Sequence, residues 1–292
     1  MLSSTVNLRG LKWLELKISG FPDLEAELDV FLSSCQLGGW VVEAEVPQLR
    51  WLAYLPCESD WESRLQSIIS GIENLGAECV VGNSVVDEDW AHCWKKFYHA
   101  KRFGKHIVVC PSWEDFVAKK DDIVITLDPG MAFGTGYHAS TSMCLEMLEN
   151  VFAEGVPQRV LDVGTGSGIL ALAAKLLGAE EVVASDSDPV AVKVSQENFQ
   201  NNNLKEGVKI REYVGVPSDE GKFPLVCANL VASLLCRLAR SLSESLDDEG
   251  KLIVSGIVQE RAEDVIAEFS DCELKLIERL DEDEWVCLLL SK

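Results

Sequence analysis

The chain has 292 residues, of which 47% are hydrophobic, and this is enough to fill the cores of two modest domains. Its 48 acidic residues outnumber 26 basic ones, which gives a formal net charge of −22. Such a charge repels a nucleic-acid backbone, so no direct nucleic-acid binding is expected, and it favours either a basic partner or simple solubility.

The sequence also excludes several classes of protein. No apolar run approaches the roughly 18–20 residues that span a membrane, and residues 1–10 lack the basic and apolar blocks of a secretory signal. The ten cysteines form no C-x-x-C pair and have no metal-ligand spacing with the four histidines. We therefore expect reduced thiols, no metal and a cytoplasmic protein.

Residues 1–86 are predicted to form a small α+β domain. Apolar residues alternate with charged ones at 14–18, which predicts a strand, and recur at helical spacing at 24–35. The elements that follow are expected at 40–46 (strand), 50–55 (strand), 61–75 (helix) and 79–86 (strand). This β-α-β-β-α-β order is typical of a ferredoxin-like sandwich. No catalytic constellation is visible, so the domain is interpreted as a substrate-recognition module or as a purely structural lobe.

Residues 87–119 are interpreted as a linker helix and connector, and a second domain is predicted over 120–292. The linker helix begins with three acids at 87–89 and has an aromatic face, which is more typical of a packed connector than of a ligand cage. That face consists of Trp90, Trp94, Phe97 and Tyr98. The basic residues Lys101, Arg102 and Lys105 are predicted to lie in a solvated turn, and short strands are expected at 107–110 and 123–127.

The stretch DPGMAFGTGYHAST at 128–141 is rich in residues that break regular structure. Ser140 or Thr141 can cap the helix that follows. The stretch is either a plain connection or a loop that closes over a ligand. In the second case, Phe133 can cover an adenine or a methionyl arm, and Thr141 can hydrogen-bond the amino-acid end.

The next stretch, VLDVGTGSG at 160–168, is an apolar run followed by three glycines at alternate positions, and the helix-forming ILALAAKLL comes directly after it. A strand, a glycine turn and a helix make a mononucleotide-binding unit. Gly164 and Gly166 let a ligand approach the backbone, and the helix directs its free N–H groups at that ligand. The dinucleotide fingerprint requires a further glycine where this chain has Ile169.

A second apolar run at 182–185 ends at Asp186, 22 residues after Gly164. An acid at this distance binds a ribose diol in such folds. Asp186 can alternatively cap the helix that begins near Pro189, and both roles are possible for Asp186 and Asp188 together.

The rest of the chain alternates strands and helices, which predicts a mainly parallel sheet with both faces covered. Further strands are expected at 208–214, 223–228 and 251–255, with an antiparallel pair at 274–277 and 285–290. Asn229 ends one of these strands, so it is expected at the ligand-binding edge, although it can also cap a helix.

Taken together, these motifs resemble those of a known protein family. The pattern D-x-G-x-G-x-G with Asp186 beyond it resembles motif I of the class I S-adenosylmethionine-dependent methyltransferases. The runs DPGMAFGTGYHAST, VLDVGTGSGILALAA, SDSDPVA and VCANLVASLL resemble the ribosomal protein L11 methyltransferase family over about 120–292. The resemblance implies a class I, Rossmann-like α/β domain with a seven-stranded mainly parallel sheet, behind a ferredoxin-like substrate-recognition domain. It also implies methylation of lysine ε-amines and of the α-amino group of a basic ribosomal protein.

The family's cofactor residues fall on Thr141, Gly164, Asp186 and Asn229. Two departures are visible in the loop, where Tyr137 replaces a threonine and Ala139-Ser140 replaces Pro-Thr. Motif I has Thr165 where cysteine is frequent, and Asn229 is followed by Leu-Val-Ala instead of the Pro-Pro-Tyr that grips a planar amide or base.

The expected mechanism is in-line displacement at the sulfonium carbon, in which the protein aligns an amine and excludes water. No residue is marked by the sequence as the general base, and His138 and Asp128 are weak candidates. The expected molecule is a monomer whose partner is a basic ribosomal protein. A methyltransferase for a small metabolite and a non-catalytic binding protein with this fold are the alternatives.

Overall fold

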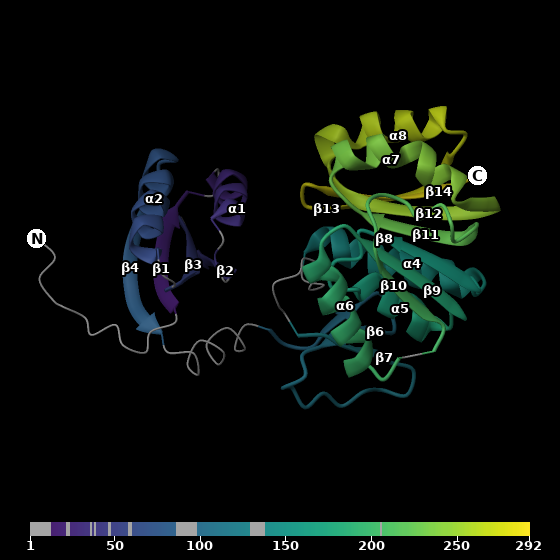
Figure 1. Cartoon of the computed structure of the whole chain (residues 1–292), viewed down its shortest axis with the longest axis horizontal. Helices are drawn as coiled ribbons and strands as arrows, with labels where there is room; N and C mark the ends of the chain where they lie inside the picture. The colour runs from purple at the N-terminus through teal and green to yellow at the C-terminus, as the bar shows by residue number, and fades with distance from the viewer. Residues whose placement is uncertain are drawn as a thin grey trace, which may run out of the picture. The chain divides into compact units, whose positions relative to one another are not determined.

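The computed structural model describes residues 13–21, 24–35, 37, 39–45, 48–57, 60–85, 98–128, 138–204 and 206–292. The chain divides into two compact units, Met1–Tyr98 and His99–Lys292 (Figure 1). The aromatic linker helix expected at 87–98 falls almost wholly outside the described residues. So does Phe133. Within the part that is described, no helix is long and apolar enough to cross a membrane.

The first unit has the β-α-β-β-α-β order that the sequence predicts. Its elements are β1 (Trp13–Gly20), α1 (Glu25–Ser34), β2 (Gly39–Glu45), β3 (Gln48–Pro56), α2 (Trp61–Asn74) and β4 (Glu78–Val85). The four strands form an antiparallel sheet in the order β2-β3-β1-β4. Alternate residues of β1 and β3 are fully buried, among them Leu16, Ile18 and Trp51, and they pack with α1 and α2 in a core of the unit's own.

The second unit is built on a seven-stranded sheet in the order β10-β9-β8-β11-β12-β14-β13. Its strands are β8 (Arg159–Val163), β9 (Glu181–Asp186), β10 (Val208–Glu212), β11 (Phe223–Asn229), β12 (Leu246–Val258), β13 (Lys275–Glu282) and β14 (Trp285–Ser291). All paired neighbours from β10 to β12 are parallel, and β14 runs antiparallel to both β12 and β13. This confirms the predicted mainly parallel α/β sheet and its antiparallel end.

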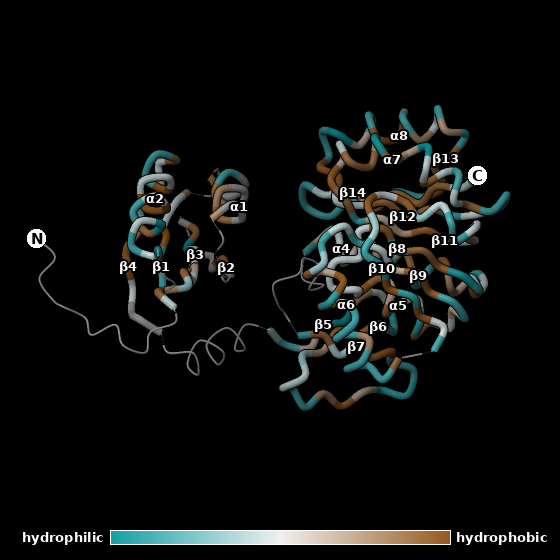
Figure 2. The backbone as a smooth tube through the Cα atoms, in the orientation of Figure 1, coloured by the Kyte–Doolittle hydropathy of each residue, from teal (hydrophilic) through white to brown (hydrophobic). Residues whose placement is uncertain are grey.

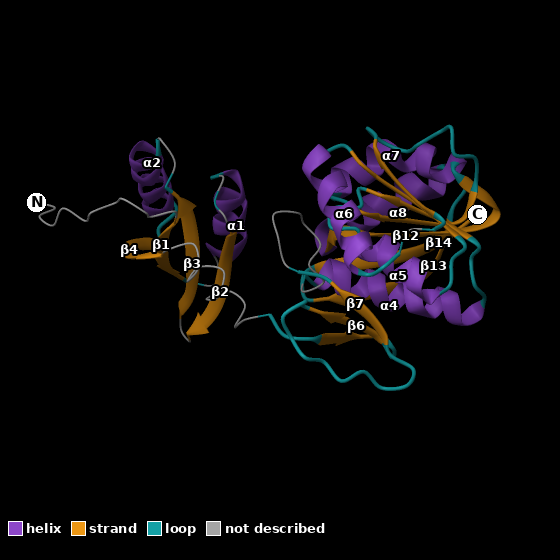
Figure 3. Cartoon of the chain, turned by 60° about the horizontal axis from the view of Figure 1, so that its bottom comes forward, coloured by secondary structure: helices purple, strands orange, loops and turns teal. Residues whose placement is uncertain are grey.

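Helices cover both faces of this sheet (Figure 3). They are α4 (Ala139–Glu154), α5 (Ile169–Leu177), α6 (Pro189–Asn201), α7 (Ala232–Glu244) and α8 (Ala262–Asp271). Side chains of α4, α5 and α6 share one core with alternate strand residues such as Val160, and side chains of α7 and α8 share the other with Leu161 and Val163. The central strands are accordingly hydrophobic along their length (Figure 2). A strand with both faces covered needs such a continuous apolar run.

A small sheet of β5 (Lys101–Phe103), β6 (Ile107–Cys110) and β7 (Ile123–Thr126) packs against α4 and α5. The predicted solvated turn is confirmed for Lys105, which is exposed between β5 and β6, but it is wrong for Lys101 and Arg102, because these residues lie in β5. Arg102 donates a hydrogen bond of 2.8 Å to Asp122, and this bond lowers the pKa of the Asp122 carboxyl to about 2. A strand with charged side chains lacks the apolar alternation on which the prediction relied.

The turn between β5 and β6 is attached to α4 by a buried carboxylate. Glu149 of α4 accepts the backbone N–H of Lys105 at 2.6 Å and that of His106 at 2.7 Å. The side chain is only 7% exposed. A buried carboxylate of this kind is stabilised only while its donors are in place.

We expect Glu149→Gln to lower the free energy of unfolding by about 1–3 kcal/mol, because a buried amide offers one acceptor oxygen to the two backbone donors and loses the charge that strengthens both hydrogen bonds. Urea denaturation measures this change. Glu146→Gln is the matched control, since Glu146 is exposed on the same helix. Equal stability of the two variants would contradict the role of Glu149.

Candidate functional site

A pocket of about 640 Å³ lies at the carboxyl edge of the seven-stranded sheet. The sheet order reverses there, because β9 follows β8 on one side and β11 lies on the other. Ligands of open α/β sheets bind at such a switch point. Five of the six predicted site residues line this pocket, namely Thr141, Gly164, Gly166, Asp186 and Asn229.

The glycine turn after β8 forms the floor of the pocket. Gly164, Gly166 and Gly168 have φ values of 72°, 54° and 85°, which L side chains rarely adopt. A Cβ atom on Gly164 would lie 2.4 Å from a methyl carbon of Leu230, and one on Gly168 would lie 2.4 Å from the Ser195 hydroxyl. The turn then enters α5, whose N-cap is Gly168. Its first N–H groups therefore lie beside the pocket.

Asp162 near the end of β8 binds the glycine turn and the helix that follows it. One carboxylate oxygen accepts the Thr165 hydroxyl at 2.6 Å and the backbone N–H of Ala171 at 3.3 Å. Among the described residues, the other oxygen has no hydrogen-bond partner. Burial raises the pKa of Asp162 from 3.8 to about 6, against the lowering effect of the Thr165 and Ala171 hydrogen bonds.

Asp186 ends β9 and faces the same pocket. Its two oxygens accept the backbone N–H groups of Gly166 at 2.9 Å and of Asp188 at 3.0 Å. The helix-cap role belongs to Asp188, which accepts the Val190 N–H at 2.8 Å at the start of α6. An ionised carboxylate has about four lone-pair sites, so two remain on Asp186 for a ligand.

Thr141 and Asn229 meet on the other side of the glycine turn. The Asn229 side-chain N–H donates to the Thr141 hydroxyl at 3.2 Å, and the Asn229 Oδ1 atom is buried without a partner among the described residues. Val231 is the N-cap of α7, so Asn229 does not cap that helix. An orphaned buried acceptor at a pocket wall is satisfied by a donor on a ligand.

The two weak candidates for a general base are engaged in local structure. His138, and neither Ser140 nor Thr141, caps α4, because Ala139 already begins the helix and the His138 Nδ1 atom accepts the Ser140 N–H at 3.2 Å. Its ring packs edge-on against Trp285 at a centroid distance of 4.6 Å. Asp128 accepts both the N–H and the hydroxyl of Ser112 at 2.7 Å. Neither residue is part of the pocket lining that the structure describes.

Sequence reasoning missed one wall of the pocket. Tyr213, Val214 and Gly215 follow β10 and line the pocket, as do Arg237 and Leu238 of α7, and Leu238 lies next to Gly215. The Tyr213 N–H donates to the Asp186 carbonyl at 2.8 Å. Only the position of Tyr213–Gly215 in the sequence could have predicted their place at the pocket, because a loop that follows a parallel strand lies at the ligand-binding edge of the sheet.

Three comparisons with known proteins agree with this geometry. A family model described as "Ribosomal protein L11 methyltransferase (PrmA)" matches residues 37–292. A ribosomal protein L11 methyltransferase of Heliobacterium modesticaldum is 39% identical over 257 residues, covering 85% of this chain and 80% of that one. One of Geobacter sp. is 46% identical over 210 residues, covering 70% and 68% of the two chains. The crystal structure of a ribosomal protein L11 methylase from Lactobacillus delbrueckii subsp. bulgaricus has a TM-score of 0.62 at 32% identity, covering 67% of this chain and 99% of that one.

The raised pKa of Asp162 predicts a pH effect on stability. Because the folded protein holds this proton more tightly than the unfolded chain, the contribution of Asp162 is most favourable below pH 4 and is lost as the pH rises through about 6. The free energy of unfolding of the wild type should therefore fall by about 3 kcal/mol more than that of Asp162→Asn over this range. Urea denaturation at a series of pH values measures the difference, and parallel pH profiles would contradict it.

Proposed function

We infer what this chain methylates from one premise: the chain belongs to the ribosomal protein L11 methyltransferase family. It is therefore an S-adenosylmethionine-dependent protein methyltransferase with a class I catalytic fold. We propose that its substrate is ribosomal protein L11 and that the acceptors are lysine ε-amines and the α-amine.

The pocket residues fit the cofactor. Asp186 has lone pairs left for the two hydroxyls of a ribose, and Gly164 and Gly166 line the pocket without side chains, so a ligand can approach their backbone. The orphaned Oδ1 atom of Asn229 lacks a donor, and the amino group of a methionyl arm can supply one. We propose that Asp186 binds the ribose, that Asn229 and Thr141 bind the amino-acid end, and that Phe133 covers the ligand.

This assignment gives the pocket a direction. Asp186 and the Tyr213–Gly215 wall are joined by a backbone hydrogen bond, so the nucleoside half is proposed to lie there. Thr141 and Asn229 are joined by their side chains and hold the other half. The cofactor, when bound, supplies an electrophilic methyl carbon on sulfur. The chain aligns the amine and excludes water.

The charge of the chain supports a basic substrate, because a net charge of −22 attracts a positively charged protein and repels nucleic acid. We propose that residues 1–86 present this protein to the catalytic unit. A lysine amine has a pKa near 10.4 in water and attacks only when deprotonated. Entry into a pocket with apolar walls such as Val163, Leu230 and Leu234 lowers that pKa by desolvation.

Asp186→Ala should raise the Kd for S-adenosylhomocysteine by about a hundredfold or more, because two hydrogen bonds to a charged acceptor are lost. Isothermal titration calorimetry measures the change. The matched control is Asp188→Ala, which removes the α6 cap and some stability but no pocket residue. An unchanged affinity in Asp186→Ala would overturn the ribose assignment.

Methyl transfer to L11 is the direct test of the proposed substrate. The purified full chain is incubated with labelled S-adenosylmethionine and separately with L11, with a second basic large-subunit protein and without any protein, and mass spectrometry locates the label. We expect label on lysine and α-amino nitrogens of L11 alone. Turnover without a protein acceptor would indicate a small-molecule methyltransferase, and no transfer to anything would indicate a non-catalytic binding protein.

A further inference from the structure

The wall of the pocket beside Asp186 belongs to an irregular loop, residues 213–222, that joins β10 to β11. Its first three residues line the pocket, and its last residues lie at the opposite, amino edge of the sheet. Val214 is 85% exposed, so burial of its side chain does not hold the wall in place. The start of the loop is held by the Tyr213 N–H bond to Asp186 and by Val216, which packs against the core, and its far end has a separate anchor.

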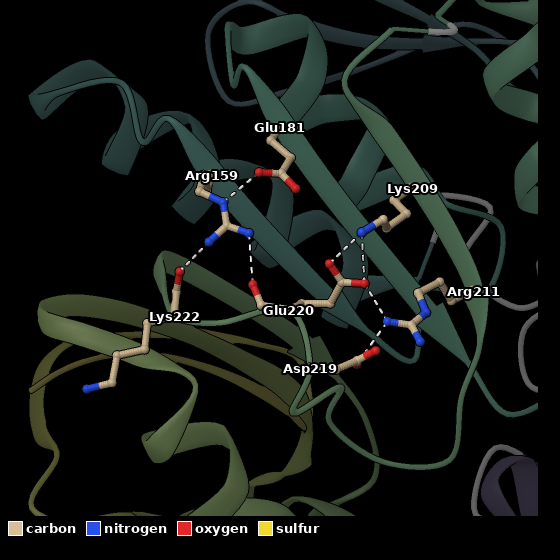
Figure 4. Close-up of polar contacts among 7 residues, drawn as sticks. All are labelled: Arg159, Glu181, Lys209, Arg211, Asp219, Glu220 and Lys222. Carbon is tan, nitrogen blue, oxygen red and sulfur yellow. Dashed lines mark hydrogen bonds and ion pairs between the residues drawn. The ribbon is translucent and has the colours of Figure 1, made fainter.

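An ion cluster at the far end of the loop supplies this anchor (Figure 4). The Glu220 side chain is 6% exposed and accepts the Lys209 ammonium at 2.7 Å and the Arg211 guanidinium. Arg211 also donates to Asp219 at 2.9 Å. Lys209 and Arg211 both belong to β10, so the strand that precedes the loop also binds its far end.

The backbone of the loop is held from a second strand. Arg159, the first residue of β8, donates to the carbonyls of Glu220 at 2.9 Å and Lys222 at 2.7 Å (Figure 4). Its Nε atom donates to Glu181 of β9 at 2.6 Å, and its guanidinium lies 4.5 Å from the centre of the Phe223 ring. Two strands, β10 and β8, therefore hold the end of the loop, and Glu181 of β9 orients Arg159.

Arg211 connects this anchor to the pocket. Its guanidinium carbon lies 5.6 Å from the centre of the Tyr213 ring, within the range of a cation–π contact. One side chain therefore contacts both the pocket end of the loop and, through Asp219 and Glu220, its far end. Because the Glu220 side chain is buried, removing its charge leaves Lys209 without this partner and Arg211 with Asp219 alone, and it loosens both ends together.

We propose that Arg211 and Glu220 are positioning residues for cofactor binding: they hold Tyr213–Gly215 in the conformation that receives the nucleoside half. This proposal rests on the proposed function, since it takes the nucleoside to lie beside Asp186. Neither residue lines the pocket, so each acts through the loop. If the loop without its anchor adopts the cofactor-binding conformation for only about a tenth of the time, the apparent Kd for the cofactor rises about tenfold.

The test compares Glu220→Gln with a matched control. Arg279→Gln disrupts another arginine–carboxylate cluster with more exposed acids, because Arg279 of β13 bridges Asp281 on the same strand and Glu263 on α8, at the opposite edge of the sheet. Calorimetry gives the Kd for S-adenosylhomocysteine and for 5′-methylthioadenosine, which carries the nucleoside without the amino-acid end. Steady-state kinetics give kcat and KM, and urea denaturation gives stability.

We expect Glu220→Gln to raise both Kd values and the KM for the cofactor by about tenfold, with kcat at saturating cofactor unchanged. Arg279→Gln should leave all four binding and kinetic values unchanged. Glu220→Asp, which keeps the charge, should recover part of the affinity. If Glu220→Gln does not fold, Arg211→Lys provides the same comparison, since lysine keeps the charge but loses the planar contact with Tyr213.

Three outcomes would overturn the proposal. The first is wild-type affinity in a folded Glu220→Gln or Arg211→Lys variant. The second is weaker binding of S-adenosylhomocysteine alone, which would place the effect away from the nucleoside. The third is an equal loss of affinity in Arg279→Gln, which would make it a general consequence of lower stability. The ribose assignment fails separately, since it depends on the affinity of Asp186→Ala.

Discussion

The pocket depends on the backbone path between β8 and α5. The three glycines at alternate positions in this turn take positive φ values, and two of them, Gly164 and Gly168, have no room for a Cβ atom. This path brings the Gly166 N–H to the Asp186 carboxylate and places Gly164 against Leu230, so the turn joins the ends of β9 and β11. Asp162 stabilises it from behind through Thr165 and Ala171, although burial makes its negative charge costly. A conformation that only glycine adopts easily is thus supported by a carboxylate that is held away from water.

Much of this arrangement is predictable from the sequence because it depends on short local patterns of residues. The strands that end at Val163, Asp186 and Asn229 are short apolar runs between turn signals, and parallel strands bring their carboxyl ends together. Thr141 precedes the first of these strands on a capped helix. All four motifs therefore meet at one pocket. That they hold the cofactor stays a prediction, as does the role of Phe133.

The features that the sequence did not predict depend on contacts between residues that are far apart in the chain. Arg159 and Lys222 are 63 positions apart in the sequence, and neither belongs to a recognisable motif. The Tyr213–Gly215 wall has no signature because exposed and partly exposed residues of an irregular loop follow no period. The β5 strand was not predicted for a related reason: it contains charged residues, one of which is bound by Asp122, so it shows no apolar alternation. In each case a side chain far away in the chain decides the local structure.

The hydrophobic cores of the two units have a thermodynamic consequence. Among the residues that the structure describes, the core of the first unit consists of residues between Leu14 and Cys79, and the two cores around the seven-stranded sheet consist of residues from Phe103 onward. Each unit can lose its packing while the other keeps its own, so heat or denaturant need not melt the chain in one cooperative step. A single melting temperature then describes neither unit. Calorimetric scans of this enzyme are better resolved into two transitions, and each substitution is assigned to the transition that it moves.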